Sequence, residues 1–337
     1  ATVPSTSPNV VISIVYPSDY VPQVTPSSTT TTNTTTEPTT KAPVVQMVDY
    51  KYTITDDSVT VTGYFGSDMT PVIPAEINGL PVSKIGYNCF KGTQITSVYI
   101  PDTVHMIDTG AFSSCTKLKN VYFLSDATSI DIGPSAFQNC KALVNIKLPT
   151  ETRTIGNNAF SGCSLASVTI NSDAIMNQHD YLHDIFGSQV KEYVIGDSIT
   201  EIRNNTFQNY SSLESVTIGK NVTSIGENAF EGCSKIDSII WNAKNCADFS
   251  KKENAPFYDC RSQIKSFTFG EAVEHIPAYL CYGMEKLTNI VLFNKTKTIG
   301  NSAFEGCIRL GKVTLGSSIQ NIAAKAFAGC TRLYDVY

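Results

Sequence analysis

Hydrophobic and polar positions alternate over short stretches that recur along most of the chain. In the pattern L-x-x-V-x-I, seen at Leu213, Val216 and Ile218, the last positions have the two-residue period of a strand whose Val and Ile point inward. A turn follows, and then the pattern I-G-x-x-A-F. We expect its Ile, Ala and Phe to enter the core from a short helical or 3₁₀ turn on the opposite side.

The two patterns form one unit, I-G-x-x-A-F-x-G-C-x-x-L-x-x-V-x-I, with clear copies starting at Ile155, Ile225 and Ile299. One unit cannot bury both of its faces, but stacked units can, with their strands paired in a parallel sheet. The pattern therefore predicts a solenoid of about eleven repeats of roughly 23 residues. Each copy has one anchor residue: Phe90, Phe112, Phe137, Phe160, Phe186, Phe207, Phe230, Phe257, Leu280, Phe304 and Phe327.

Most of the ten cysteines follow the repeat. Seven lie three residues after an anchor, so we expect a ladder of small, buried, free thiols rather than a disulfide framework. Cys89, Cys246 and Cys281 lie outside this register, and a bridge among them stays open. The seven ladder positions are Cys115, Cys140, Cys163, Cys233, Cys260, Cys307 and Cys330.

The segment before the repeats has a different composition. Residues 25–40 are almost entirely Thr, Ser, Pro and Asn, which cannot bury enough surface to offset their ordering entropy. We expect residues 1–43 to be a disordered tail or stalk, although the apolar run within residues 9–21 is long enough for an extra strand. The net charge of −5 argues against nucleic acid, and no apolar run reaches the length of a membrane span.

The repeating unit resembles the BspA-like (TpLRR) class of leucine-rich repeats, and the similarity covers about residues 49–337. Residues 52–64 look like a hairpin around Asp56 and Asp57, and residues 72–86 look like an entry half-repeat. The resemblance implies an α/β solenoid with its parallel sheet on the concave face, a β-rich N-terminal cap over residues 44–84 and the repeats over 85–337. It also implies a surface or secreted protein of bacteria or mucosal protists, linked to adhesion and without common catalytic residues.

Three departures from the unit stand out. The copy around Phe186 lacks A-F-x-G-C, Tyr210 replaces the ladder cysteine of the next copy, and residues 242–256 lengthen one turn. Extra residues in a solenoid leave the stack as a loop on one face. Such a loop can carry binding specificity, but most are tolerated insertions, and we favour that interpretation here.

Side chains between the inward positions of each strand should point outward and line a binding face. Tyr99 and Tyr122, with Lys147, are the candidates for a hot spot, since Tyr is enriched in recognition sites, although strand propensity also favours Tyr. Trp241, beside Ile240, is expected in the core or at the turn. The predicted binding residues are Tyr99, Tyr122, Lys147, Thr169, Thr217, Ile240, Thr268 and Thr314.

Candidate chemistry is sparse. His179 and His183 stand four residues apart, and on a helix they could hold a metal with Asp184, but the Glu of zinc peptidases is missing. We therefore predict no cofactor and no catalysis, and an extracellular module that binds a protein or glycan on a host or microbial surface through the concave sheet or the irregular repeats. A metal-dependent enzyme is a remote alternative. A second alternative is a rigid spacer in a larger protein, because the last copy reaches Tyr337 without a polar cap and we expect the native chain to continue.

Overall fold

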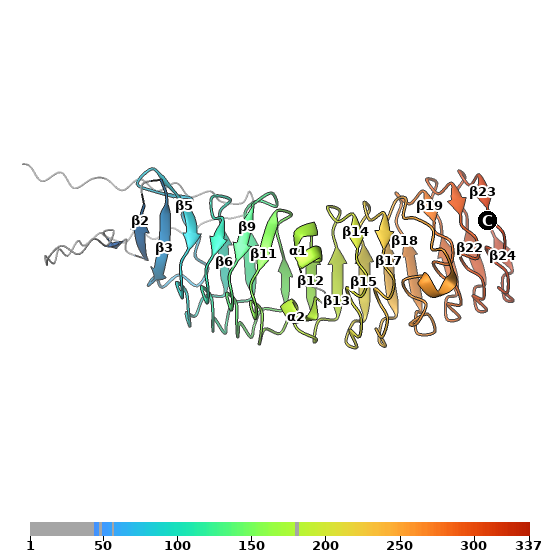
Figure 1. The fold of residues 1–337 in the computed structure, drawn as a ribbon, viewed down its shortest axis with the longest axis horizontal. Coiled ribbons are helices and arrows are strands. Elements are labelled where there is room, and N and C mark those ends of the chain that lie inside the picture. Colours follow the sequence, from blue (N-terminus) through green and yellow to red (C-terminus); the bar gives the residue numbers. More distant parts are fainter. Residues whose placement is uncertain (1–43, 47–48, 56, 179–181) are drawn as a thin grey trace, which may run out of the picture. The chain divides into compact units, whose positions relative to one another are not determined.

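The computed structural model describes residues 44–46, 49–55, 57–178 and 182–337. It divides into two units, which are considered separately. The first contains the described residues up to Leu143 together with Ile155–Cys163, and the second contains Val144–Thr154 and Ser164–Tyr337. Both are stacks of similar turns, or rungs (Figure 1). The tail or stalk predicted for residues 1–43, including the possible strand within 9–21, lies outside the described residues.

The first unit opens with an antiparallel sheet of β1 (Val44–Gln46), β2 (Tyr50–Ile54) and β3 (Val59–Tyr64). The predicted hairpin is therefore present between β2 and β3, with Asp56 outside the described residues. Strand β3 then pairs in parallel with β5 (Leu80–Ile85), and β4 (Glu76–Ile77) folds back on β5 through Asn78 and Gly79, both with positive φ. The antiparallel cap thus passes directly into the parallel stack.

Each regular rung contributes one strand to each of two sides. The L-x-x-V-x-I strands form what we call the sheet side, which in the first unit consists of β6 (Ser97–Ile100) and β8 (Asn120–Phe123). The I-G-x-x-A-F segments form the turn side. There β7 (Met106–Ile107) pairs in parallel with β5 and with β9 (Ile130–Ile132), while β11 (Thr152–Ile155) runs from the second unit into the first.

The second unit repeats this arrangement. Its sheet side is β10 (Asn145–Lys147), β12 (Ser167–Ile170), β13 (Glu192–Ile195), β15 (Ser215–Ile218), β17 (Ser238–Trp241) and β18 (Ser266–Phe269), followed by β20 (Asn289–Val291), β22 (Lys312–Thr314) and β24 (Asp335–Val336). Its turn side has β14 (Glu201–Ile202) paired with β16 (Ser224–Ile225), and β19 (His275–Ile276), β21 (Thr298–Ile299) and β23 (Asn321–Ile322) paired in order. The stacked-repeat architecture is as predicted.

The turn side differs from the expected helical turn. After its short strand, each regular rung makes successive tight turns, such as those closed by Ala111 N–H to the Asp108 carbonyl and by Cys115 N–H to the Phe112 carbonyl. Gly110 and Ser114 between them have positive φ, which interrupts any helix. The helices of the described chain are α1 (Asp173–Gln178), α2 (His183–Phe186) and the 3₁₀ turn η1 (Lys252–Asn254), all in the irregular copies.

Stacked phenylalanine rings form the spine of the core. In the first unit Phe90, Phe112, Phe137 and Phe160 lie in consecutive rungs with ring centroids 4.8–5.3 Å apart and nearly parallel planes. All four are buried, and the spacing matches that of paired strands. Since identical rungs place identical rings at this spacing, the repeat itself produces the stack.

One predicted anchor is wrong. The N–H of Cys281, not of Leu280, donates to the Ala303 carbonyl, just as the Phe304 N–H donates to the Ala326 carbonyl one rung later. The Cys307 thiol likewise donates to the Cys281 carbonyl, where other ladder thiols reach an anchor phenylalanine. Cys281 therefore occupies the anchor position, and the ring missing there is replaced by Phe267 and Phe269 from β18, which pack 4.9 Å apart and near Phe257 and Phe304.

Candidate functional site

The predicted aromatic pair is stacked on the sheet side of the first unit. Tyr99 of β6 and Tyr122 of β8 are register partners, and their ring centroids lie 4.8 Å apart at an interplanar angle of 18°. Tyr122 is 43% exposed, whereas the inward neighbours Val98 and Val121 are buried. Beside the rings, the Asn120 amide donates to the Ser97 hydroxyl at 3.2 Å. The strands thus hold two rings in one orientation next to polar groups.

The remaining predicted residues lie on the sheet side of the second unit, where the strands lie side by side (Figure 1). Thr169, Val194, Thr217, Ile240 and Thr268 pair from one strand to the next and form a row of outward positions. Ile240 is 42% exposed. Lys147, Thr169, Thr217, Ile240, Thr268 and Thr314 all alternate with buried residues, as expected.

This row carries hydroxyl and methyl groups but, apart from Lys147, no charge. It therefore offers contact area and hydrogen bonds rather than acid–base chemistry. A role in binding, for these residues and for the tyrosine pair, stays a prediction, as does the concavity of the face. Trp241 is fully buried beneath it, which confirms that it belongs to the core.

The histidine pair is only partly described. His183 and Asp184 lie in α2, with His183 Nε2 and Asp184 Oδ1 3.4 Å apart, while His179 lies outside the described residues. The His183 ring also packs edge-on against Tyr210 at 5.7 Å. Within the described ranges, no three His, Cys, Asp or Glu residues gather as metal ligands would. The three-residue metal site stays a prediction.

Tyr210 has a structural part in the same irregular region. Its hydroxyl donates to the Gly187 carbonyl and lies 2.8 Å from the buried hydroxyl of Tyr193. In regular rungs a ladder thiol reaches back in the same way, as when Cys233 Sγ donates to the Phe207 carbonyl at 3.0 Å. The larger Tyr210 therefore makes the link to the preceding rung that a cysteine makes elsewhere.

Most of the cysteine thiols are poorly placed for nucleophilic chemistry. All ten cysteines are described and free, and all but Cys330 are buried. Burial raises the pKa of Cys233 and of Cys246 to about 12 and that of Cys281 well above its usual range. Since the thiolate is the reactive form, these groups are suited to packing.

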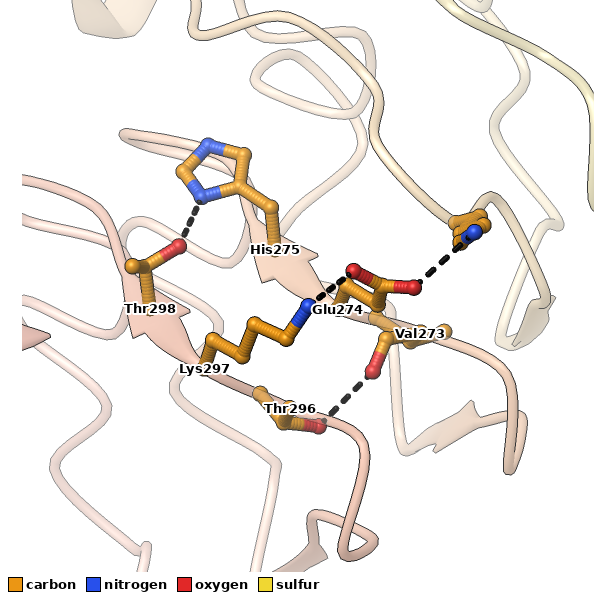
Figure 2. A network of polar contacts seen from close by, with 7 residues as sticks. Val273, Glu274, His275, Thr296, Lys297 and Thr298 are labelled. Carbon is orange, nitrogen blue, oxygen red and sulfur yellow. Dashed lines mark hydrogen bonds and ion pairs between the residues drawn. The ribbon is translucent and has the colours of Figure 1, made fainter. Parts of the chain in front are cut away.

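A polar network on the turn side of the second unit was not anticipated (Figure 2). Glu274 accepts from Lys297 at 2.7 Å and from Lys244 at 2.9 Å, which joins three rungs. The hydrogen bonds from Lys297 and Lys244 lower the pKa of Glu274 to about 2. Beside it, His275 Nδ1 lies 2.6 Å from Thr298 Oγ1.

The same histidine continues the chain of contacts to a carboxylate. His275 Nε2 lies 2.8 Å from Asp248 Oδ1, which also accepts the Ala278 N–H at 2.7 Å. A hydroxyl, an imidazole and a carboxylate in this order resemble the relay of acyl-transfer enzymes. However, the backbone N–H groups of Thr298 and Gly300 donate to the Glu274 and Ile276 carbonyls, so they are not free to stabilise an oxyanion. The arrangement fits a link between rungs.

Sequence reasoning missed this network because only the pair His179 and His183 stands close together along the chain. Aligning the repeats on the Ile of I-G places His275 and Thr298 at the same position of adjacent rungs, and that alignment is the signal that would have found the pair. Asp248 comes from the lengthened segment 242–256, where the alignment ends.

No helix in the described residues has both the length and the apolar character needed to cross a membrane. The predicted absence of cofactors and of catalysis remains a prediction.

Comparison with solved structures finds several leucine-rich repeat proteins. A leucine rich cell surface protein from Faecalibacterium prausnitzii is 22% identical, with 88% of this chain and 95% of that chain covered and a TM-score of 0.39. A leucine-rich repeat protein from Bacteroides capillosus is 33% identical over 37% of this chain and 96% of its own, with a TM-score of 0.34. The leucine rich repeat protein of T. pallidum is 20% identical, with 87% and 91% covered and a TM-score of 0.26.

A search of curated proteins gave no significant match. The family model of the BspA type leucine rich repeat region matches in six copies, over residues 83–131, 131–251 and 250–337. These matches extend over most of the chain and over the rungs described above. The chain therefore belongs to the BspA-type leucine-rich repeat family, a family of repeat proteins suited to binding or scaffolding.

Proposed function

We propose that this protein is a non-catalytic extracellular binding module, and that Tyr99 and Tyr122 anchor its partner on the sheet side of the first unit. One observation carries the proposal: two tyrosine rings are stacked in register on a face where most other outward side chains are small or polar. Tyrosine offers a large contact area with few rotatable bonds and a hydrogen-bonding hydroxyl, and it is enriched among residues that dominate binding energy.

The stacking favours a protein over a glycan at this position. Because the two rings cover each other's inner faces, their rims and hydroxyls are the parts that a partner meets. The rims lie beside the Asn120 amide, which gives the mixed apolar and polar surface common in protein interfaces.

A location outside the cell, on the surface of a bacterium or secreted from it, belongs to the same proposal. The Thr/Ser/Pro-rich segment 25–40 supports it, since such a segment suits a stalk between a surface and the repeats. Adhesion to a host or microbial surface is the role that this arrangement would serve.

The test is saturable binding of the full chain to immobilised matrix proteins, mucins and glycans. We expect binding to a protein that weakens at least tenfold, or about 1.4 kcal/mol, in Tyr99→Ala/Tyr122→Ala. The control is Phe65→Ala/Tyr87→Ala, which removes two exposed rings of the first unit that lie outside β6 and β8. Equal loss in both variants, or unchanged binding in the tyrosine variant, would contradict the site. No binding to any target would favour the rigid spacer.

A further inference from the structure

A second group of aromatic side chains lies on the turn side of the second unit. The residue after the anchor reaches or approaches the surface there, and in regular rungs it is small or polar, as in Gln208, Glu231 and Glu305. In two consecutive rungs it is Tyr258 and Tyr282, whose ring centroids lie 6.3 Å apart. Tyr279 lies a further 6.3 Å from Tyr282. The three rings form what we call the tyrosine cluster.

Arg261 is held over this cluster without a carboxylate partner. Its guanidinium carbon lies 4.0 Å from the centroid of the Tyr258 ring, and its Nη1 donates to the Tyr258 carbonyl. Gly283 leaves room for it, because a Cβ there would come within 3.1 Å of the arginine side chain. Across the described ranges no carboxylate lies within ion-pair distance of Arg261. A planar fork of donors is thus fixed in place with its charge uncompensated, which is how arginine is prepared to bind an anion.

The lengthened segment supplies a second cation. Lys252 of η1 places Nζ 5.3 Å from the centroid of the Tyr282 ring, and its one ion pair within the described part of the chain is a long contact of 4.0 Å with the adjacent Glu253. Two cation–π pairs therefore stand side by side, on Tyr258 and on Tyr282. The segment that looked like a tolerated insertion contributes directly to this surface.

The Tyr279 ring is held beside the cluster. Its φ is +62°, and positive φ recurs at the equivalent position of other rungs, as at Asn228, Ser302 and Lys325. The conformation is therefore a feature of the repeat, and what is particular to this rung is the aromatic ring that it carries. The Asn301 amide donates to the Tyr279 hydroxyl at 3.1 Å and fixes the ring beside Tyr282.

We propose that Arg261 and Lys252, with Tyr258, Tyr279 and Tyr282, bind an acidic glycan, in which a sugar carboxylate or sulfate meets the cations and the sugar ring packs on the tyrosine cluster. An extended peptide fits less well, because the local backbone donors are engaged: the N–H groups of Tyr279, Cys281 and Gly283 all donate to the next rung. The site is separate from the sheet side of the first unit and does not depend on the proposal made for it.

The test uses the full chain and three immobilised glycans of different charge. These are a sulfated glycosaminoglycan, a polyuronate that carries only carboxylates, and neutral dextran. We expect saturable, salt-sensitive binding to at least one of the two acidic glycans and none to dextran, and comparison of the two identifies the preferred anion. Absence of binding to both acidic glycans, or equal binding to dextran, would overturn the proposal.

Two variants locate the site. Arg261→Lys keeps the charge but loses the planar fork, and Tyr282→Ala removes the central ring; each should weaken binding at least tenfold while thermal unfolding shows an intact fold. The matched controls are Arg309→Lys and Tyr334→Ala, at exposed positions elsewhere in the second unit, and they should bind like the parent. Tyr99→Ala/Tyr122→Ala should also leave glycan binding unchanged. Full binding by Arg261→Lys and Tyr282→Ala, or preference for an acidic peptide such as polyglutamate, would overturn the proposal.

Discussion

The regular rungs around Phe137 and the irregular rungs around Cys281 reach a filled core in different ways. Phe137 lies between Phe112 and Phe160, 5.1 and 5.3 Å away, and each ring is supported by copies of itself. At Cys281 the anchor ring is absent, and Phe267 and Phe269 of β18 occupy the space from the sheet side. The regular core is filled by identical rings in successive rungs. The irregular core has a small residue, Cys281, at the anchor position and two large residues, Phe267 and Phe269, on the opposite strand.

The surfaces of these rungs differ in parallel with their cores. In the regular rung the anchor Phe137 is followed by the polar Gln138. The irregular rungs carry the tyrosine cluster, Arg261 and the lengthened segment. The Arg261 surface therefore coincides with a break in the repeat, whereas the Tyr99–Tyr122 pair lies on regular rungs. The following predictions test the contrast between the two cores.

The largest effect is expected from opening the regular stack. Phe137→Ala should lower the free energy of unfolding by about 3–5 kcal/mol, because it leaves a cavity between two rings that cannot collapse onto it. Cys281→Ala, at the equivalent position of the irregular rung, should cost about 1 kcal/mol, since it removes one buried sulfur atom. Urea denaturation followed by circular dichroism measures both. Similar losses in the two variants would show that the two cores are not built differently.

The exchange at Cys281 can be reversed. Cys281→Phe alone should destabilise by about 1–3 kcal/mol, because Phe267 and Phe269 already fill the space. Adding Phe267→Val and Phe269→Ile, which restores the residue types of the regular strands, should recover much of that loss. The triple variant is compared with each parent by denaturation. Additive losses, with no recovery, would contradict the account of shared volume.

The other irregular region predicts a smaller effect. Tyr210→Phe should cost about 1–2 kcal/mol, because it removes the hydroxyl that donates to the Gly187 carbonyl and leaves the buried Tyr193 hydroxyl without its partner. In Tyr193→Phe/Tyr210→Phe the Tyr193 hydroxyl, which the single variant leaves unpaired, is also removed. The second substitution should therefore add little further cost. Thermal denaturation compares the two. A double variant that loses twice as much as the single one would rule out a coupled hydroxyl pair.

The contrast also explains how far sequence could predict this molecule. The solenoid and its outward rows follow from inward positions such as Val216 and Ile218, because every rung repeats the same burial. The anchor at Cys281 was missed because hydrophobicity favoured Leu280, although counting from Ile276 gives the correct register. The tyrosine cluster and the Asp248–His275–Thr298 contacts escaped because residues far apart in sequence meet only when rungs stack. Their partners also come from a segment that the repeat does not describe.

The smallest effect concerns the charges that join irregular rungs. Since Lys297 and Lys244 lower the folded pKa of Glu274 to about 2, below the roughly 4.3 of an unfolded glutamate, its contribution to stability is present above about pH 4 and is lost as the pH falls through about 2. Glu274→Gln should therefore lose less stability than the parent between pH 5 and 2.

Thermal unfolding at each pH measures this, with Glu285→Gln as the exposed control. The side chains of Lys244 and Lys297 are about half exposed, so added salt should shrink the difference. If Glu274→Gln kept the parent's full loss of stability at low pH, the polar network would have no part in joining the rungs. The irregular rungs would then depend on apolar packing, such as that of Phe267 and Phe269, rather than on these charges.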